Sequence, residues 1–180
     1  SRDLILLALL TGARRSNVAA MRWADLHLDE GYWRIAKTKN GTPQNVTLSP
    51  LAVSVLQARA KSCSAEEAKI LEHCARPELH PIGFVFPSAG KSGHILDPRK
   101  AWERLLADAS LEDFRFHDLR RTLGSWQART GASLPVIGKS LNHKTLQATQ
   151  IYARLDLDPV RDSVNTATEA MMTVAGVSLE

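Results

Sequence analysis

The chain has 180 residues, 44% of them apolar, which is enough for one domain with its own core but cramped for two. No apolar run approaches the roughly 20 residues of a membrane-spanning helix. The only two cysteines, Cys63 and Cys74, do not form a disulfide framework or a four-ligand metal site, and they predict reduced thiols in an intracellular protein.

The net charge of +4 is unevenly distributed along the chain. Residues 1–50 carry +3 and residues 112–154 carry +4, whereas residues 155–180 carry −4. A basic surface attracts phosphate backbones, and a solvated basic surface has the same composition. Charge alone therefore permits a nucleic-acid partner without requiring one.

Periodicity and capping residues predict a mainly helical chain. The expected helices are residues 3–10, 16–22, 51–62, 64–73, 97–109, 117–129, 133–141, 144–154 and 160–176. Ser16 is a possible N-cap, and Ser64 with Glu67 has the spacing of a capping box. Pro98 is expected at the first position of its helix. Pro159 is expected to separate the last two helices.

Strand formers are concentrated in one short region. Residues 32–37 alternate between apolar and polar, residues 44–49 form a second short run, and Asn40-Gly41 between them is a strong hairpin signal. The predicted fold class is therefore a mainly α domain with one small antiparallel β-sheet.

Each candidate functional group also has an ordinary structural explanation. Arg14 follows the helix-ending Gly12, where a cation favours the helix dipole. His117 and Arg120 share one face of a predicted helix, as a solvated basic face would. His143 lies at a corner between helices, and Tyr152 is one of only two tyrosines.

The order of these groups along the chain is a more specific indication of function than any one of them alone. Six candidate groups follow one another along the chain in the order Arg14, Lys39, His117, Arg120, His143 and Tyr152. His117-Asp-Leu-Arg120 has the form His-x-x-Arg, and His143 precedes Tyr152 by nine residues. This arrangement resembles the active site of tyrosine recombinases of the phage-integrase type, over about residues 1–155. Four weak motifs in the right order are a specific signal together.

Three positions depart from that family's usual pattern. Asn17 stands where an acidic residue is common, which affects a supporting contact. Asn142 replaces a glycine, and asparagine tolerates the left-handed conformation that a glycine would adopt. Thr47 replaces a proline after the hairpin, so Lys37 remains an alternative to Lys39; the two face the same side of a strand.

The resemblance implies DNA cleavage and rejoining through a 3′-phosphotyrosyl bond to Tyr152. Arg14 and Arg120 would clamp the nonbridging phosphate oxygens, and His143 would donate a further hydrogen bond. His117 would accept the tyrosine proton or hold the phosphate, and Lys39 would protonate the leaving 5′-oxygen. The sequence has no clear carboxylate cluster for a metal, and neither a metal, another cofactor nor ATP is expected.

The resemblance also predicts the partners and the domains. Double-stranded DNA is the expected substrate, a homotetramer on DNA the expected assembly, and the cytoplasm, at the bacterial nucleoid, the expected location. The residues expected to contact phosphates are Arg15, Arg115, Arg121, Lys144 and Thr145. Residues 1–155 would be the catalytic domain of a longer protein with a separate N-terminal DNA-binding domain.

Residues 156–180 are expected to be a C-terminal segment that docks in cis or in trans. Val160, Val164, Ala167, Met171 and Val174 would form one apolar stripe on a helix. The sequence permits three other functions: a type IB topoisomerase that nicks and religates, a DNA-binding module with a decayed active site, and a helical interaction domain.

Overall fold

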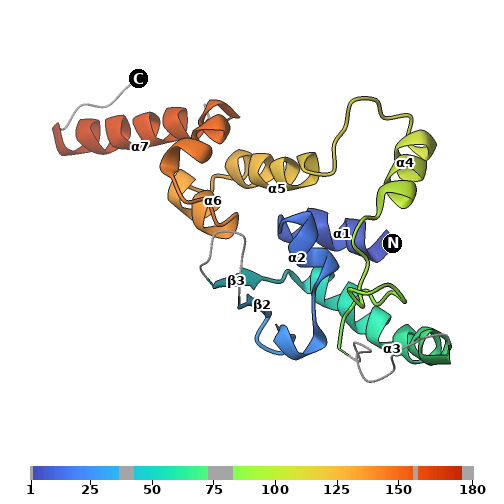
Figure 1. The fold of residues 1–180 in the computed structure, drawn as a ribbon. Helices are drawn as coiled ribbons and strands as arrows, with labels where there is room; N and C mark the ends of the chain where they lie inside the picture. The colour runs from blue at the N-terminus through green and yellow to red at the C-terminus, as the bar shows by residue number, and fades with distance from the viewer. Residues whose placement is uncertain (1, 37–42, 73–82, 156–157, 176–180) are drawn as a thin grey trace. The chain divides into compact units, whose positions relative to one another are not determined.

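A computed structural model describes residues 2–36, 43–72, 83–155 and 158–175 (Figure 1). The helices are α1 (Arg2–Thr11), α2 (Arg15–Ala19), α3 (Pro50–Glu72), α4 (Arg99–Asp108), α5 (Asp118–Arg129), α6 (Leu134–Ser140) and α7 (Asp158–Ala175). The described residues also form the 3-10 helices η1 (Trp23–Asp25), η3 (Leu146–Ala148) and η4 (Gln150–Leu155). The predicted mainly helical fold with one small sheet is confirmed.

The sheet is antiparallel and has the order β1 (Leu26–His27), β2 (Tyr32–Ile35) and β3 (Gln44–Thr47). Trp33 pairs with Leu26 on one side and with Val46 on the other. Trp33, Ile35 and Val46 are buried, whereas Arg34 between them is exposed. The alternation that predicted β2 and β3 therefore has its usual cause, because one face of the sheet covers the core.

The chain forms two compact units, Ser1–Leu123 with Ser140–Asn142, and Gly124–Lys139 with His143–Glu180. In the first unit, Leu4 and Leu7 of α1, Leu56 of α3 and Phe86 are fully buried. Phe84–Phe86 joins this core through backbone bonds, since Val85 N–H donates to Met21 O at 2.8 Å. The short apolar run Phe84–Phe86 is thus a core segment beside the end of α2.

The second unit contains the C-terminal part of α5, then α6, η3, η4 and α7. Its buried residues include Ala128, Ile137, Thr149 and Tyr152. In α7, the described side chains from Arg161 to Val174 are exposed, except that Met172 is half-buried. No helix in the described part of the chain is long and apolar enough to cross a membrane.

Several predicted boundaries were wrong. Pro50–Glu72 forms the single helix α3, because the good helix formers after Ser64 continue the preceding helix. Arg14 is the N-cap of α2, so Ser16 lies inside the helix. Pro98 is the N-cap of α4 and does not occupy its first helical position.

Two further corrections concern the C-terminal third. Residues 144–154 form the 3-10 helices η3 and η4 instead of one α-helix, because i to i−3 bonds such as Tyr152 N–H to Thr149 O tighten the backbone. Pro159 lies in the first turn of α7, where its missing N–H has no intrahelical partner to lose. The predicted Asn40-Gly41 hairpin turn lies outside the described residues.

Candidate active site

The first motif begins where α1 ends. Gly12 has φ +59°, and its N–H donates to Ala8 O at 3.1 Å, so it ends α1 in the left-handed conformation. A Cβ at this position would lie 2.7 Å from Leu141 Cδ2 and 2.9 Å from Leu123 Cδ2. Glycine is therefore needed for both backbone conformation and space. Arg14 follows in an extended conformation as the N-cap of α2.

Arg120 of α5 is buried, with only 5% of its surface exposed. Its Nη1 donates to the carbonyl of Gly12 at 2.6 Å, and its Nη2 donates to the carbonyl of Leu141. The guanidinium of Arg120 thus forms hydrogen bonds with the motifs that contain Gly12 and Leu141, and so links three sequence motifs. Carbonyl acceptors make this burial possible, because a buried charged group without hydrogen bonds would be strongly destabilising.

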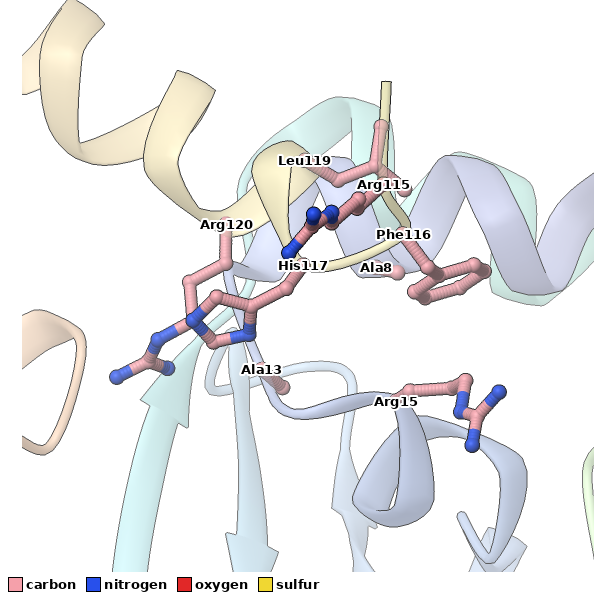
Figure 2. A pocket seen from close by; sticks show the side chains of 8 residues that line it. All are labelled: Ala8, Ala13, Arg15, Arg115, Phe116, His117, Leu119 and Arg120. Carbon is pink, nitrogen blue, oxygen red and sulfur yellow. The ribbon is translucent and has the colours of Figure 1, made fainter. Parts of the chain in front are cut away.

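Arg120 also lines a pocket of about 330 Å³ in the first unit (Figure 2). His117 lies beside it in the wall, and Arg15 and Arg115 contribute two further cations. The rest of the lining is Ala8, Ala13, Phe116 and Leu119. A pocket lined by three arginines and a histidine is suited to a phosphate, since guanidiniums present paired N–H donors to its oxygens.

The electrostatics of the pocket act on His117. Partial burial of its ring is the main reason that the pKa of His117 is below the ordinary value of 6.5, although the residue as a whole is exposed. The charges of Arg120, Arg121 and Arg14 lower this pKa further, and Asp118 opposes them. The imidazole is therefore held towards its neutral form, which can accept a proton.

The flanking arginines expected on DNA have acidic neighbours. Arg15 pairs with Asp97 at 2.8 Å and Arg121 pairs with Asp118 at 2.9 Å, and both arginine side chains are about half exposed or more. Asp118 also accepts a hydrogen bond from the backbone N–H of Arg115 at 2.8 Å. Exposed pairs of this kind contribute about 0–1 kcal/mol, so a phosphate can replace the carboxylate at little cost.

The second unit carries the motif residues His143 and Tyr152. Asn142, just before His143 in the chain, has φ +51°, which confirms that asparagine adopts the left-handed turn expected there. The N–H of His143 then donates to Gly138 O at 2.9 Å, the six-to-one bond of a Schellman motif. The backbone of His143 is thereby fixed to the end of α6.

Tyr152 of η4 is buried, with 3% of its surface exposed. Its ring is nearly parallel to that of His143, with an interplanar angle of 7° and centroids 6.4 Å apart. A Cβ on Gly124 would lie 2.5 Å from Tyr152 Cζ, so the phenol packs directly on the backbone of α5. The structure thus brings His143 and Tyr152 together within this unit.

The other predicted residues divide into two groups. Lys39 and its alternative Lys37 lie outside the described residues. Lys144 is exposed, and Thr145 is the N-cap of η3, where its side chain accepts from Ala148 N–H. Both residues are exposed and therefore accessible to a phosphate.

Sequence reasoning missed four residues that shape these sites: Asp97, Gly124, Gly138 and Thr149. Asp97 is 82 residues from its partner Arg15, so no local spacing could reveal the pair. Gly124 and Gly138 sit inside helices, where an isolated glycine is unfavourable by about 1 kcal/mol relative to alanine. That unfavourable placement was a signal of close packing.

Comparison with known proteins agrees with these motifs. The sequence model described as "Phage integrase family" matches residues 1–158, and the chain belongs to this family. It is 30% identical over 173 residues to prophage integrase IntF of Escherichia coli K12, which covers 96% of this chain and 34% of that protein. It is 27% identical to the integrase of Salmonella phage P22, covering 86% of this chain and 39% of the phage protein.

Solved structures show the same fold. The XerH site-specific recombinase bound to its difH substrate superposes with a TM-score of 0.66 at 22% identity, over 91% of this chain and 44% of that chain. The catalytic domain of bacteriophage HP1 integrase gives 0.60 at 18% identity, over 91% and 79%. The chain therefore has a catalytic-domain fold of this family and spans little more than a third of the two curated relatives.

Proposed function

We propose that this chain is the catalytic part of a site-specific DNA recombinase that cleaves and rejoins DNA through Tyr152. Membership of the phage integrase family, with the complete Arg14, His117, Arg120, His143 and Tyr152 set in order, carries this proposal. The relatives are named integrases and tyrosine recombinases, which does not favour a topoisomerase or a module that has lost its activity.

The proposed reaction exchanges one phosphodiester for another. Tyr152 Oη attacks the phosphorus, a 3′-phosphotyrosyl bond forms, and the bond to the 5′-oxygen breaks. The tyrosine proton passes to His117, and Lys39 gives a proton to the 5′-oxygen. A 5′-hydroxyl then attacks the phosphotyrosyl bond and releases Tyr152, so that the bond energy is conserved without ATP. The residue set requires neither a metal nor another cofactor.

Charge stabilisation is assigned to the arginines. Negative charge grows on the nonbridging oxygens in the pentacoordinate transition state, and Arg14 and Arg120 are proposed to bind them. The anchoring of Arg120 on two carbonyls supports this role, because a fixed donor needs little reorganisation during the reaction. The lowered pKa of His117 supports its role as a base, since the neutral imidazole can accept the proton.

The DNA-facing surface is proposed to include Arg15, Arg115, Arg121, Lys144 and Thr145. These residues would contact phosphates on both sides of the cut and orient the duplex without reading its sequence. Binding would weaken steeply with salt, because each neutralised phosphate releases a counterion. We assign the double-stranded DNA of the bacterial nucleoid as the substrate.

The C-terminal segment, residues 156–180, is proposed to dock on a neighbouring subunit of a DNA-bound homotetramer, with residues 1–155 as the catalytic domain. Val164, Met171 and Val174 of α7 are 58%, 70% and 91% exposed. An apolar stripe of this kind is typical of a surface that another protein covers. Docking in cis remains the competing outcome.

Covalent trapping tests the proposal and identifies the cleaved DNA sequence in the same experiment. The chain is incubated with duplexes that carry a randomised core and a nick placed so that the cleaved fragment diffuses away. Adducts that survive denaturation are isolated and their DNA is sequenced. We expect a single enriched site and a phosphotyrosyl peptide that contains Tyr152.

Two variants serve as controls for the chemistry. Tyr152→Phe should retain DNA binding and form no adduct, whereas Tyr32→Phe should form adducts at the normal rate. An adduct that persists in Tyr152→Phe, or a modified peptide that contains Tyr32, would refute the assignment.

A further inference from the structure

The side chain of Thr149 lies beside the candidate catalytic histidine. Thr149 is fully buried, with 0% of its surface exposed, and its Oγ1 is 2.9 Å from His143 Nδ1. Polar groups at such depth are almost always hydrogen-bonded, because leaving one unsatisfied is unfavourable by about 1–3 kcal/mol. This hydroxyl therefore has a defined direction, which decides the state of the imidazole.

Only one arrangement satisfies both groups. Within the described part of the chain, Nδ1 of His143 is the partner of the Thr149 hydroxyl, and burial keeps water away from it. If Nδ1 carried a proton, it would donate to the hydroxyl oxygen, and the buried O–H of Thr149 would have no acceptor among the described residues. If the hydroxyl donates to a bare Nδ1, the imidazole proton resides on Nε2.

Gly138 makes this arrangement possible. A Cβ at position 138 would lie 3.1 Å from Thr149 Oγ1, which is too close unless the buried hydroxyl moves. The carbonyl of the same glycine accepts the N–H of His143 at 2.9 Å. The backbone of His143 and the partner of its ring are thus both positioned against one residue of α6.

We propose that Thr149 is a positioning residue that holds neutral His143 as its Nε2–H tautomer, ready to donate a hydrogen bond to the reacting phosphate. This inference rests on the proposed function, in which His143 is such a donor. Without the hydroxyl, the neutral ring would populate both tautomers, and the form without a proton on Nε2 would repel a phosphate oxygen.

The tautomer can be measured without DNA. Long-range proton–nitrogen correlation on protein labelled with ¹⁵N-histidine separates protonated from bare ring nitrogens, and His143→Gln assigns the signal among the six histidines. Above the titration of the ring, the unsubstituted protein should show a bare Nδ1 and a protonated Nε2. A protonated Nδ1 there would overturn the proposal, whatever any variant does.

Variants then link the tautomer to the reaction. Thr149→Val keeps the shape and removes the hydroxyl; it should mix the tautomers and slow adduct formation on the trapped DNA roughly 10- to 100-fold, through lost orientation. Thr149→Ser should restore the tautomer and most of the rate. Thr130→Val removes an exposed hydroxyl that donates to carbonyls in the last turn of α5, and it should change neither.

The outcomes separate this inference from the proposed function. If Thr149→Val folds and retains both the tautomer and the rate, Thr149 does not position His143. If no form of the protein makes an adduct with any DNA, the proposed function fails, and the nitrogen spectra still decide whether Thr149 holds the ring.

Discussion

The ring of Tyr152 packs against the backbone of α5 at Gly124, where a Cβ would lie 2.5 Å from Cζ and 2.8 Å from Oη. The ring cannot swing away freely, because Tyr152 is almost fully buried. The position of the proposed nucleophile is therefore set by the absence of a side chain on a neighbouring helix.

Gly124→Ala tests this relationship. Alanine in a helix is ordinarily more stable than glycine by about 0.5–1 kcal/mol, but overpacking a core is unfavourable by about 1–3 kcal/mol. We expect a net loss of unfolding free energy in urea denaturation, together with a strongly reduced rate of adduct formation. A more stable protein with the normal rate would show that Tyr152 moves aside easily.

Arg120→Ala should destabilise the protein as well as slow the reaction. It leaves the carbonyls of Gly12 and Leu141 without their charged donor, and each unsatisfied buried acceptor is unfavourable by about 1–3 kcal/mol. Urea denaturation should show a loss of roughly 2–6 kcal/mol on that basis. Arg120→Lys should recover only part, because one ammonium lacks the fork geometry.

Arg14 is the matched comparison for Arg120. Arg14 is half-buried, and its backbone carbonyl, which Arg14→Ala keeps, accepts the first hydrogen bonds of α2. Arg14→Ala should change the unfolding free energy by less than about 1 kcal/mol and still slow cleavage more than it weakens DNA binding. Weak binding with a full cleavage rate would make Arg14 a backbone anchor instead.

The pKa of His117 predicts how stability depends on pH. Because the folded-state pKa lies below the ordinary 6.5, the unfolded chain takes up the proton first as the pH falls. His117 therefore favours the folded state above about pH 6.5, and this contribution is lost as the pH falls through the folded pKa. Relative to His117→Gln, the unsubstituted protein should lose stability on acidification.

Proton NMR titration of the His117 ring checks the cause. The midpoint should lie below 6.5, and Arg121→Gln should raise it, because the Arg121 charge is one of the groups that lowers this pKa. Arg34→Gln, an exposed change on β2 that is not among those causes, should leave the midpoint unchanged. A midpoint at or above the ordinary value would contradict the predicted environment.

The general acid can be identified by changing the leaving group. Lys39→Ala should slow cleavage about 10²- to 10⁴-fold, as expected for a lost proton donor. A duplex with a 5′-bridging sulfur should react at nearly the normal rate, because a thiolate leaves without protonation. Equal losses on both substrates would exclude Lys39, and rescue in Lys37→Ala alone would move the role to that residue.

The exposed stripe of α7 predicts a variant that affects assembly alone. Val164→Ser with Met171→Ser should leave the unfolding free energy within about 0.5 kcal/mol, as for other exposed positions, and should reduce higher-order complexes with DNA in sedimentation. Thr166→Ser with Thr173→Ser, on the opposite face of the helix, is the matched control. Identical assembly of both double variants would show that the stripe has no partner subunit.

The amino-acid sequence by itself determined the family, the fold class and the order of the candidate groups. These properties depend on local features: the helix-ending Gly12, the His117-to-Arg120 spacing on one turn, and the left-handed Asn142 before His143. Each is set by backbone conformation and by residues a few positions apart. The structure confirmed the left-handed turns at Gly12 and Asn142.

The tertiary structure decided what each group touches. That Arg120 is held by carbonyls 108 and 21 residues away, that Tyr152 lies on Gly124 and that Thr149 faces His143 are consequences of packing between distant segments. The partners of Arg120 are backbone carbonyls, and Tyr152 occupies the space left by the missing Cβ of Gly124. Every residue has a backbone carbonyl and every glycine lacks a Cβ. Residue identity alone therefore could not select these particular positions.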